Sequence, residues 1–127
     1  MTVQLNHTFV WCPDPERSST FLAEILGRPA PTPFGLFHVV ELDNGASLDF
    51  MKSDGDAPFQ HYAFLVEEDE FDRIFGRICD RGMEYWADPA RTEPGKINHH
   101  FGGRGVYFHD PDGRLLEIIT RPYDLGA

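Results

Sequence analysis

The stretch from Phe108 to Ile118 reads Phe-His-Asp-Pro-Asp-Gly-Arg-Leu-Leu-Glu-Ile. Two apolar runs flank its Asp-Pro-Asp-Gly segment, in which Pro fixes one dihedral and Gly tolerates positive φ, so a hairpin turn is predicted. Glu117 then lies inside a strand, and Leu115 and Ile119 share its face because side chains two apart point the same way. A carboxylate among apolar groups is costly without a partner. We therefore expect a metal ion or a hydrogen-bonded cation beside Glu117.

An earlier stretch, residues 43–50, has the same layout as the end of the chain. Gly45 corresponds to Gly113 and Asp49 to Glu117 at one constant offset. This internal correspondence indicates that the chain uses one structural unit twice.

Two histidines extend the correspondence upstream. His7 and His61 each lie in a strand-like apolar run, and a helix-like segment ending at Gly27 or Gly82 follows each of them. Asp14 and Pro15 are typical of a helix start, and Gly27 is typical of a helix end. Each unit is therefore predicted to be a strand with His, a helix, and then strands ending in one with a carboxylate.

The predicted elements follow from the apolar periodicity. Strands are expected over residues 4–11, 37–42, 46–51, 59–66, 83–86, 106–109 and 114–120, and helices over 15–26 and 67–81. We predict one domain, residues 1–127, made of two modules over 3–52 and 58–121. The segment 88–105 is a long loop without a pattern of its own, and loops of that length are usually functional or mobile.

Composition and charge narrow the class of protein. Hydrophobic residues make up 41% and aromatic residues 13% of the 127-residue chain, which excludes disorder and suits a packed core. The net charge of −10 argues against nucleic acid and anionic membranes as partners, and no apolar run is long enough to span a bilayer. Cys12 and Cys79 have no CxxC spacing, so we expect two buried thiols in a cytoplasmic protein.

Three motifs, taken in order, resemble the vicinal oxygen chelate superfamily, which includes glyoxalase I, bleomycin-resistance proteins, fosfomycin-resistance transferases and extradiol dioxygenases. They are Asn6-His7, Gln60-His61-Tyr62-Ala63-Phe64, and Asp110-Pro111-Asp112-Gly113 followed by Glu117. The resemblance spans residues 3–121. It implies an α+β fold in which two tandem βαβββ modules form an open, cupped mixed sheet.

The same resemblance implies a metal site. Its ligands would be His7, His61 and Glu117, with Asp49 at a fourth position where glyoxalase I has Glu. Asp is one methylene shorter, so Asp49 is either a ligand or a group that supports one. Two imidazoles with one or two carboxylates suit a divalent ion of Fe, Mn, Ni, Co or Zn. Such an ion can bind two neighbouring oxygens of a substrate and stabilise a developing anion.

The expected activity is that of a metal-dependent enzyme acting on a small substrate with vicinal oxygens. It is either a glyoxalase-type isomerase or lyase, or a ring-cleaving dioxygenase, with Asp49, Glu117 or His100 moving the proton and Tyr107 facing the substrate. The alternative is a bleomycin-resistance-type protein that sequesters a cationic drug without turnover. Fosfomycin chemistry is disfavoured, because Phe9 stands where those transferases carry Thr.

A homodimer is also expected. Each module presents a half-open sheet whose edges and apolar faces need covering. Relatives pair such halves within a chain or between chains. If the pairing is between chains, His7 and Asp49 of one subunit would join His61 and Glu117 of the other.

Overall fold

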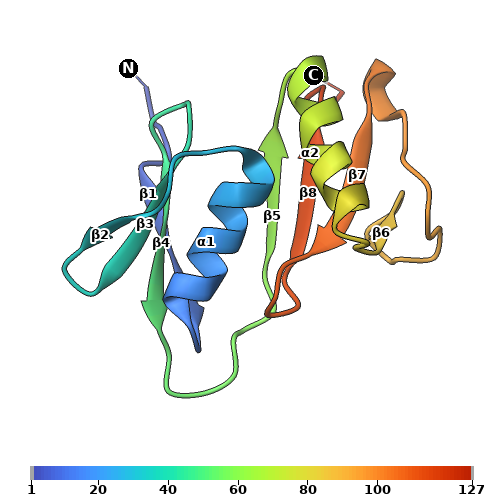
Figure 1. Cartoon of the computed structure of the whole chain (residues 1–127). Helices are drawn as coiled ribbons and strands as arrows, with labels where there is room; N and C mark the ends of the chain where they lie inside the picture. Colours follow the sequence, from blue (N-terminus) through green and yellow to red (C-terminus); the bar gives the residue numbers. More distant parts are fainter. Residues whose placement is uncertain (1, 127) are drawn as a thin grey trace. The chain divides into compact units, whose positions relative to one another are not determined.

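The computed structural model describes residues 2–126. Its contacts divide the chain into two compact units, with the boundary between Pro58 and Phe59. Each unit contains one helix and a four-stranded mixed sheet in the order βαβββ (Figure 1). This confirms the predicted α+β fold and its two modules, while the grouping of both modules into one domain stays a prediction.

The elements of the two units correspond one to one. The first unit contains β1 (His7–Cys12), α1 (Pro15–Leu26), β2 (Thr32–Phe34), β3 (Phe37–Glu41) and β4 (Ser47–Lys52). The second unit contains β5 (His61–Leu65), α2 (Glu68–Asp80), β6 (Tyr85–Trp86), β7 (Gly105–His109) and β8 (Leu115–Ile119), with a short 3-10 helix η1 (His100–Gly102) before β7.

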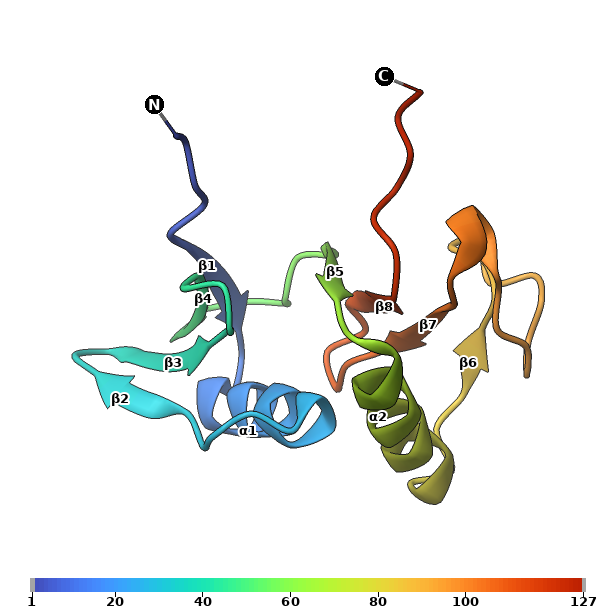
Figure 2. The ribbon, with the colours of Figure 1, turned by 90° about the horizontal axis from the view of Figure 1, so that it is seen from above.

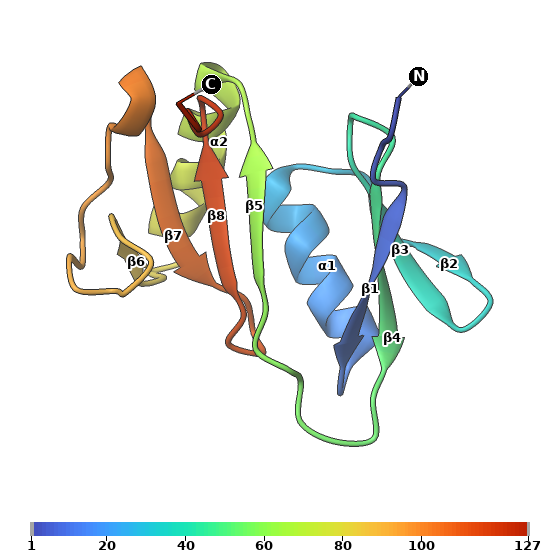
Figure 3. The same cartoon turned by 180° about the vertical axis from the view of Figure 1, so that it is seen from behind.

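Both sheets have the same topology. The strand orders are β1-β4-β3-β2 and β5-β8-β7-β6. In each sheet the first and last strands of the module pair in parallel, and the other pairs are antiparallel. Figure 3 shows β1 beside β4 in the first unit and β5 beside β8 in the second. The parallel pairs are the ones that contain the predicted metal ligands.

Each helix packs on one face of its own sheet (Figure 2). In α1, the Asp14 carboxylate accepts from the backbone N–H of Arg17, and Gly27 ends the helix in the left-handed conformation with φ of 70°. The buried stripe of α1 covers the sheet residues that alternate inward. The core of this unit includes Val10, Cys12, Leu22, Ile25, Val40, Leu48 and Phe50.

The second unit is built in the same way. Phe71, Ile74 and Ile78 form the buried stripe of α2. They share the core with Phe64, Val106, Phe108, Leu116 and Ile118. The other face of β8 therefore carries Leu115, Glu117 and Ile119, because side chains alternate along a strand.

A buried charge cluster closes the hairpin between β7 and β8. The Arg114 side chain is 1% exposed, and its Nη1 donates to Asp110 Oδ2 at 2.7 Å and to Asp112 Oδ2 at 3.0 Å. Asp110 Oδ1 accepts the backbone N–H groups of Asp112 and Arg114, each at 2.9 Å. Gly113 has φ of 84°, as Gly45 has 86° at the equivalent turn. The predicted turn is thus stabilised by buried ion pairs as well as by its Pro and Gly.

Four details differ from the expectations. Residues 4–6 lie outside the first strand, and Thr32–Phe34 form a strand that was not among those expected. The loop 88–105 contains η1. Cys79 is exposed, so the prediction of two buried thiols holds for Cys12 alone. Across residues 2–126, no helix combines the length and the apolar character needed to cross a membrane.

Candidate metal centre

His61 and Glu117 meet on the parallel strands β5 and β8. His61 lies opposite Leu115 and Ala63 opposite Glu117 in the register of this pair. The offset of two residues places the imidazole and the carboxylate on the same face. His61 Nε2 lies 3.1 Å from Glu117 Oε1.

The tautomer of His61 follows from its other nitrogen. Nδ1 lies 2.8 Å from the backbone oxygen of Leu115, and a carbonyl oxygen can only accept, so Nδ1 carries the hydrogen. In the neutral ring, Nε2 then has a lone pair directed at the Glu117 carboxylate. Two lone pairs at this distance repel unless a cation lies between them. His61 and Glu117 can therefore share either a proton or a metal ion.

Glu117 is enclosed by hydroxyl groups. Its side chain is 1% exposed, and the Tyr123 hydroxyl donates to both carboxylate oxygens, at 2.9 Å and 2.7 Å. Tyr107 lies directly across the β7–β8 ladder from Glu117. Its hydroxyl oxygen is 3.4 Å from that of Tyr123, and its ring stacks on His61 with centroids 6.0 Å apart.

Burial keeps both phenols protonated. It raises the pKa of Tyr107 above its ordinary value of 10.0, and the hydrogen bond to Tyr123 and the charge of Glu117 act in the same direction. Burial also raises the pKa of Tyr123. Because the Tyr123 proton points to Glu117, the Tyr107 hydroxyl donates to the Tyr123 oxygen. The two tyrosines thus form a chain of donors that ends on the carboxylate.

The first unit repeats this arrangement with His7 and Asp49. His7 lies opposite Ser47 and Phe9 opposite Asp49 on the parallel strands β1 and β4, which is the register of His61 and Glu117. His7 Nδ1 lies 2.7 Å from Asn6 Oδ1, so its Nε2 is again the nitrogen with the lone pair. The Ser47 hydroxyl donates to Asp49 Oδ1 at 2.7 Å. The two pairs therefore share a strand register and a histidine tautomer, while their role as metal ligands stays a prediction.

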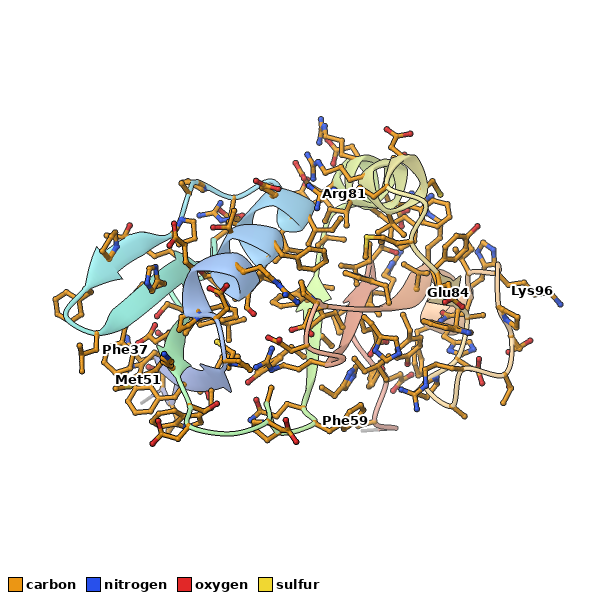
Figure 4. The ribbon with its side chains drawn as sticks, turned by 60° about the horizontal axis from the view of Figure 1, so that its bottom comes forward. Phe37, Met51, Phe59, Arg81, Glu84 and Lys96 are labelled. Carbon is orange, nitrogen blue, oxygen red and sulfur yellow. The ribbon has the colours of Figure 1, made fainter. Side chains whose placement is uncertain are left out.

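Aromatic side chains lie on the same face as His7. Phe9 is 5.9 Å from the His7 ring and stacks on Phe37 at 5.0 Å, and Trp11 meets Phe9 edge-on at 6.0 Å. Figure 4 shows Phe37 and Met51 together, from the neighbouring strands β3 and β4. Phe9 and Trp11 remain 42% and 39% exposed. An apolar surface thus adjoins the His7 and Asp49 pair.

The long loop contributes Phe101 and not His100 to the surroundings of Glu117. His100 is exposed, and its ring contact is with Phe101 at 6.3 Å. Phe101 in turn packs on the Tyr123 ring at 5.5 Å. A catalytic role for His100 stays a prediction. Lys96, on the same loop, points away from the second unit (Figure 4).

The donors present fit a divalent metal. Metal–nitrogen and metal–oxygen bonds of about 2.0–2.2 Å place two ligand atoms at a right angle roughly 3 Å apart, and His61 Nε2 and Glu117 Oε1 have this separation, 3.1 Å. A backbone carbonyl on the other imidazole nitrogen is the usual outer partner of a metal-bound His. Among residues 2–126, no three His, Cys, Asp or Glu side chains converge on one point. Each unit therefore contains two of the four predicted ligands.

The fold and these pairs define a class: proteins built from two βαβββ repeats that each present an imidazole and a carboxylate from a parallel strand pair. The family model for the Glyoxalase/Bleomycin resistance protein/Dioxygenase superfamily matches residues 4–118. The chain belongs to this superfamily.

Its similar proteins include oxidases and a transferase. The structure of oxidase ChaP-H1 is 58% identical, covers 99% of this chain and 100% of its own, and superposes with a TM-score of 0.95. Oxidase ChaP-H2 is 57% identical, covers 100% of both chains and also has a TM-score of 0.95. Metallothiol transferase FosB of Lysinibacillus sphaericus (strain C3-41) is 27% identical over 94% of this chain and 84% of its own length.

Sequence reasoning missed Tyr123. It lies beyond the last strand, in a segment without apolar periodicity, so no pattern singled it out. Its position six residues after Glu117 could have indicated it, because a turn after the last strand can bring residue 123 back to Glu117.

Proposed function

We propose that this protein is a metal-dependent oxidoreductase of the dioxygenase type, acting on a small substrate with two neighbouring oxygens. The observation that carries the proposal is the buried Glu117 carboxylate 3.1 Å from Nε2 of His61, whose Nδ1 faces the Leu115 carbonyl. A buried carboxylate is costly unless it is paired. A divalent cation satisfies both groups at once.

The proposed ligands are His7, Asp49, His61 and Glu117. The candidate ions are Fe, Mn, Ni, Co and Zn, which suit two imidazoles with one or two carboxylates. When bound, such an ion supplies a Lewis-acidic centre for two vicinal substrate oxygens. The Leu115 carbonyl and the Asn6 side chain orient the two imidazoles.

Two features support oxidation over a glyoxalase reaction. The proteins that are more than half identical to this chain are named oxidases. A glyoxalase substrate built on glutathione needs cationic partners for its carboxylates, whereas Arg104 already donates to Glu68 and Asp72, each at 2.8 Å. A dioxygenase places both atoms of O₂ in its product as a substrate carbon–carbon bond breaks, so it needs no external reductant.

The tyrosines would act as donors in this chemistry. The pKa of Tyr107 is raised by burial, so its hydroxyl holds its proton and is suited to donate to a developing oxyanion, not to act as a base. Asp49 is half-buried and accepts from Ser47 alone among its described contacts, which leaves it suited to accept a substrate proton.

We also propose a homodimer in the cytoplasm. The sheets end in edge strands that need covering, β1 and β2 in the first unit and β5 in the second, whereas residues 93–95 already pair with the outer edge of β6. One pair of ligands is too few for a structural or catalytic ion, so a second pair must complete the site. The thiols of Cys12 and Cys79 suit a reducing compartment.

The test uses the full chain reconstituted without oxygen with Fe(II), Mn(II) or Ni(II). Each form is given catechols with O₂, 2-oxoaldehyde thiol adducts, fosfomycin with a thiol, and bleomycin. Oxygen uptake with ring cleavage is expected, and it should be lost in His61→Ala but retained in His38→Ala, whose side chain lies on the opposite face of its sheet from the proposed ligands. Adduct isomerisation, thiol transfer, or metal-independent bleomycin binding without oxygen uptake would refute the proposal.

A further inference from the structure

Tyr123 reaches Glu117 from outside the sheet. It lies in the segment that follows β8, and its side chain is 48% exposed, yet its hydroxyl lies within 2.9 Å of both oxygens of a carboxylate that is 1% exposed. Strand geometry sets where the Glu117 backbone lies, but the end of a Glu side chain has three rotatable bonds. A partner outside the strand is needed to set the plane of the carboxylate.

The hydrogen bonds around Glu117 involve both of its carboxylate oxygens. Oε1 is the atom that faces His61 Nε2, at 3.1 Å. Oε2 makes the shorter bond to the Tyr123 hydroxyl, at 2.7 Å. Tyr107 donates to the Tyr123 oxygen at 3.4 Å, which keeps the Tyr123 proton directed at the carboxylate. The same hydroxyl lies 2.9 Å from Oε1, so it contacts both oxygens and sets the plane in which Oε1 faces the imidazole.

The ring of Tyr123 has a second contact, with the long loop. It packs on Phe101 with centroids 5.5 Å apart. Phe101 is a non-glycine residue at φ of 57°, a left-handed conformation that persists only where the surroundings hold it. One side chain therefore touches both the carboxylate and the loop that follows β6.

We propose that Tyr123 is a positioning residue for Glu117: its hydroxyl fixes the carboxylate so that one oxygen serves the metal, and its ring ties that carboxylate to the loop through Phe101. The inference rests on the proposed function, because it assumes that Glu117 is a ligand. Outer partners of metal ligands typically change metal affinity by about 10–100-fold. We expect an effect of that size from the hydroxyl alone.

The experiment compares Tyr123→Phe with Tyr85→Phe. The first removes the hydroxyl and keeps the ring on Phe101, and the second removes a phenol hydroxyl from the same unit, where the Tyr85 ring packs edge-on against Phe75. Mn(II) affinity is measured by competition with a chelator. The carboxyl carbon signal of Glu117 is recorded by NMR on the metal-free protein.

Tyr123→Phe should weaken Mn(II) binding about 10–100-fold and shift the Glu117 signal, while Tyr85→Phe should change neither. Wild-type affinity in Tyr123→Phe would overturn the inference and leave the proposed function standing. If the wild-type protein binds no metal, the proposed function fails. An unshifted Glu117 signal in metal-free Tyr123→Phe would then overturn the positioning role separately.

Discussion

Replacing Arg114 with Met should destabilise the protein through the turn that leads into β8. The Arg114 guanidinium is 1% exposed and lies between the carboxylates of Asp110 and Asp112. The substitution keeps most of the volume of the side chain but leaves two carboxylates without their cation. Removing one partner of a buried ion pair costs about 3–5 kcal/mol.

The loss of stability should be measurable by urea-induced unfolding. With a urea m-value of about 1.5 kcal/mol per molar, a loss of about 3–5 kcal/mol lowers the unfolding midpoint by about 2–3 M. Far-UV circular dichroism follows the transition. Metal affinity should fall as well, because the turn sets the start of the strand that carries Glu117.

The matched control is Arg73→Met on α2. Arg73 also contacts two carboxylates, Asp69 at 3.5 Å and Glu70 at 2.8 Å, but its side chain is 53% exposed. Exposed pairs contribute less than about 1 kcal/mol. If Arg114→Met lowered the urea unfolding midpoint no more than Arg73→Met does, the proposed stabilising role of the buried Arg114 ion pairs would be refuted.

Three further predictions concern the metal, pH and assembly. Glu117→Gln removes the charge of a proposed ligand and should weaken Mn(II) binding at least about tenfold, as measured by chelator competition. The control Glu84→Gln, at an exposed position, should not change the affinity. Equal effects of the two substitutions would contradict the assignment of Glu117 as a ligand. Hydrogen bonds from Thr92 lower the pKa of Asp88 below its ordinary value of 3.8. The ionised carboxylate therefore stabilises its loop fully above pH 3.8. This stabilisation is lost as the pH falls through the lower pKa of Asp88 in the folded state. Amide protection of Thr92 and Glu93 by hydrogen exchange should fall in that acidic range, and protection that stayed constant down to the unfolding pH would exclude this role for Asp88. Light scattering at micromolar concentration should give twice the chain mass of 14.5 kDa, and a monomer mass would contradict the homodimer.

Local patterns were sufficient for most of the fold. Asp14, Pro15 and Gly27 predicted the bounds of α1, because capping and helix-ending residues act through their own backbone. The pairing of His61 with Glu117 was predictable because the period of two places both side chains on one face once their strands are neighbours. The family resemblance supplied the missing neighbour relation.

Other features depend on contacts that no local pattern records. Both faces of β1 are apolar, so alternation could not tell that Val10 faces the core while Phe9 and Trp11 stay on the exposed face. Cys79 lies one position beyond the stripe residue Ile78, and this spacing places it outside the buried face of α2. Tyr123 reaches Glu117 only because the chain turns back after β8, and this turn belongs to the tertiary structure.

The parallel pairing of β5 with β8 also has a consequence for the order of folding. His61 and Glu117 are separated by 56 positions, whereas only the five residues 110–114 join β7 and β8. Local hairpins close in microseconds, and contacts between distant segments close later because more chain entropy is lost. We expect the two ligands to meet only as this unit completes its folding. A chain whose second unit is still emerging from the ribosome then has no assembled His61 and Glu117 pair with which to capture the wrong ion. At this pair, metal uptake follows folding and does not guide it.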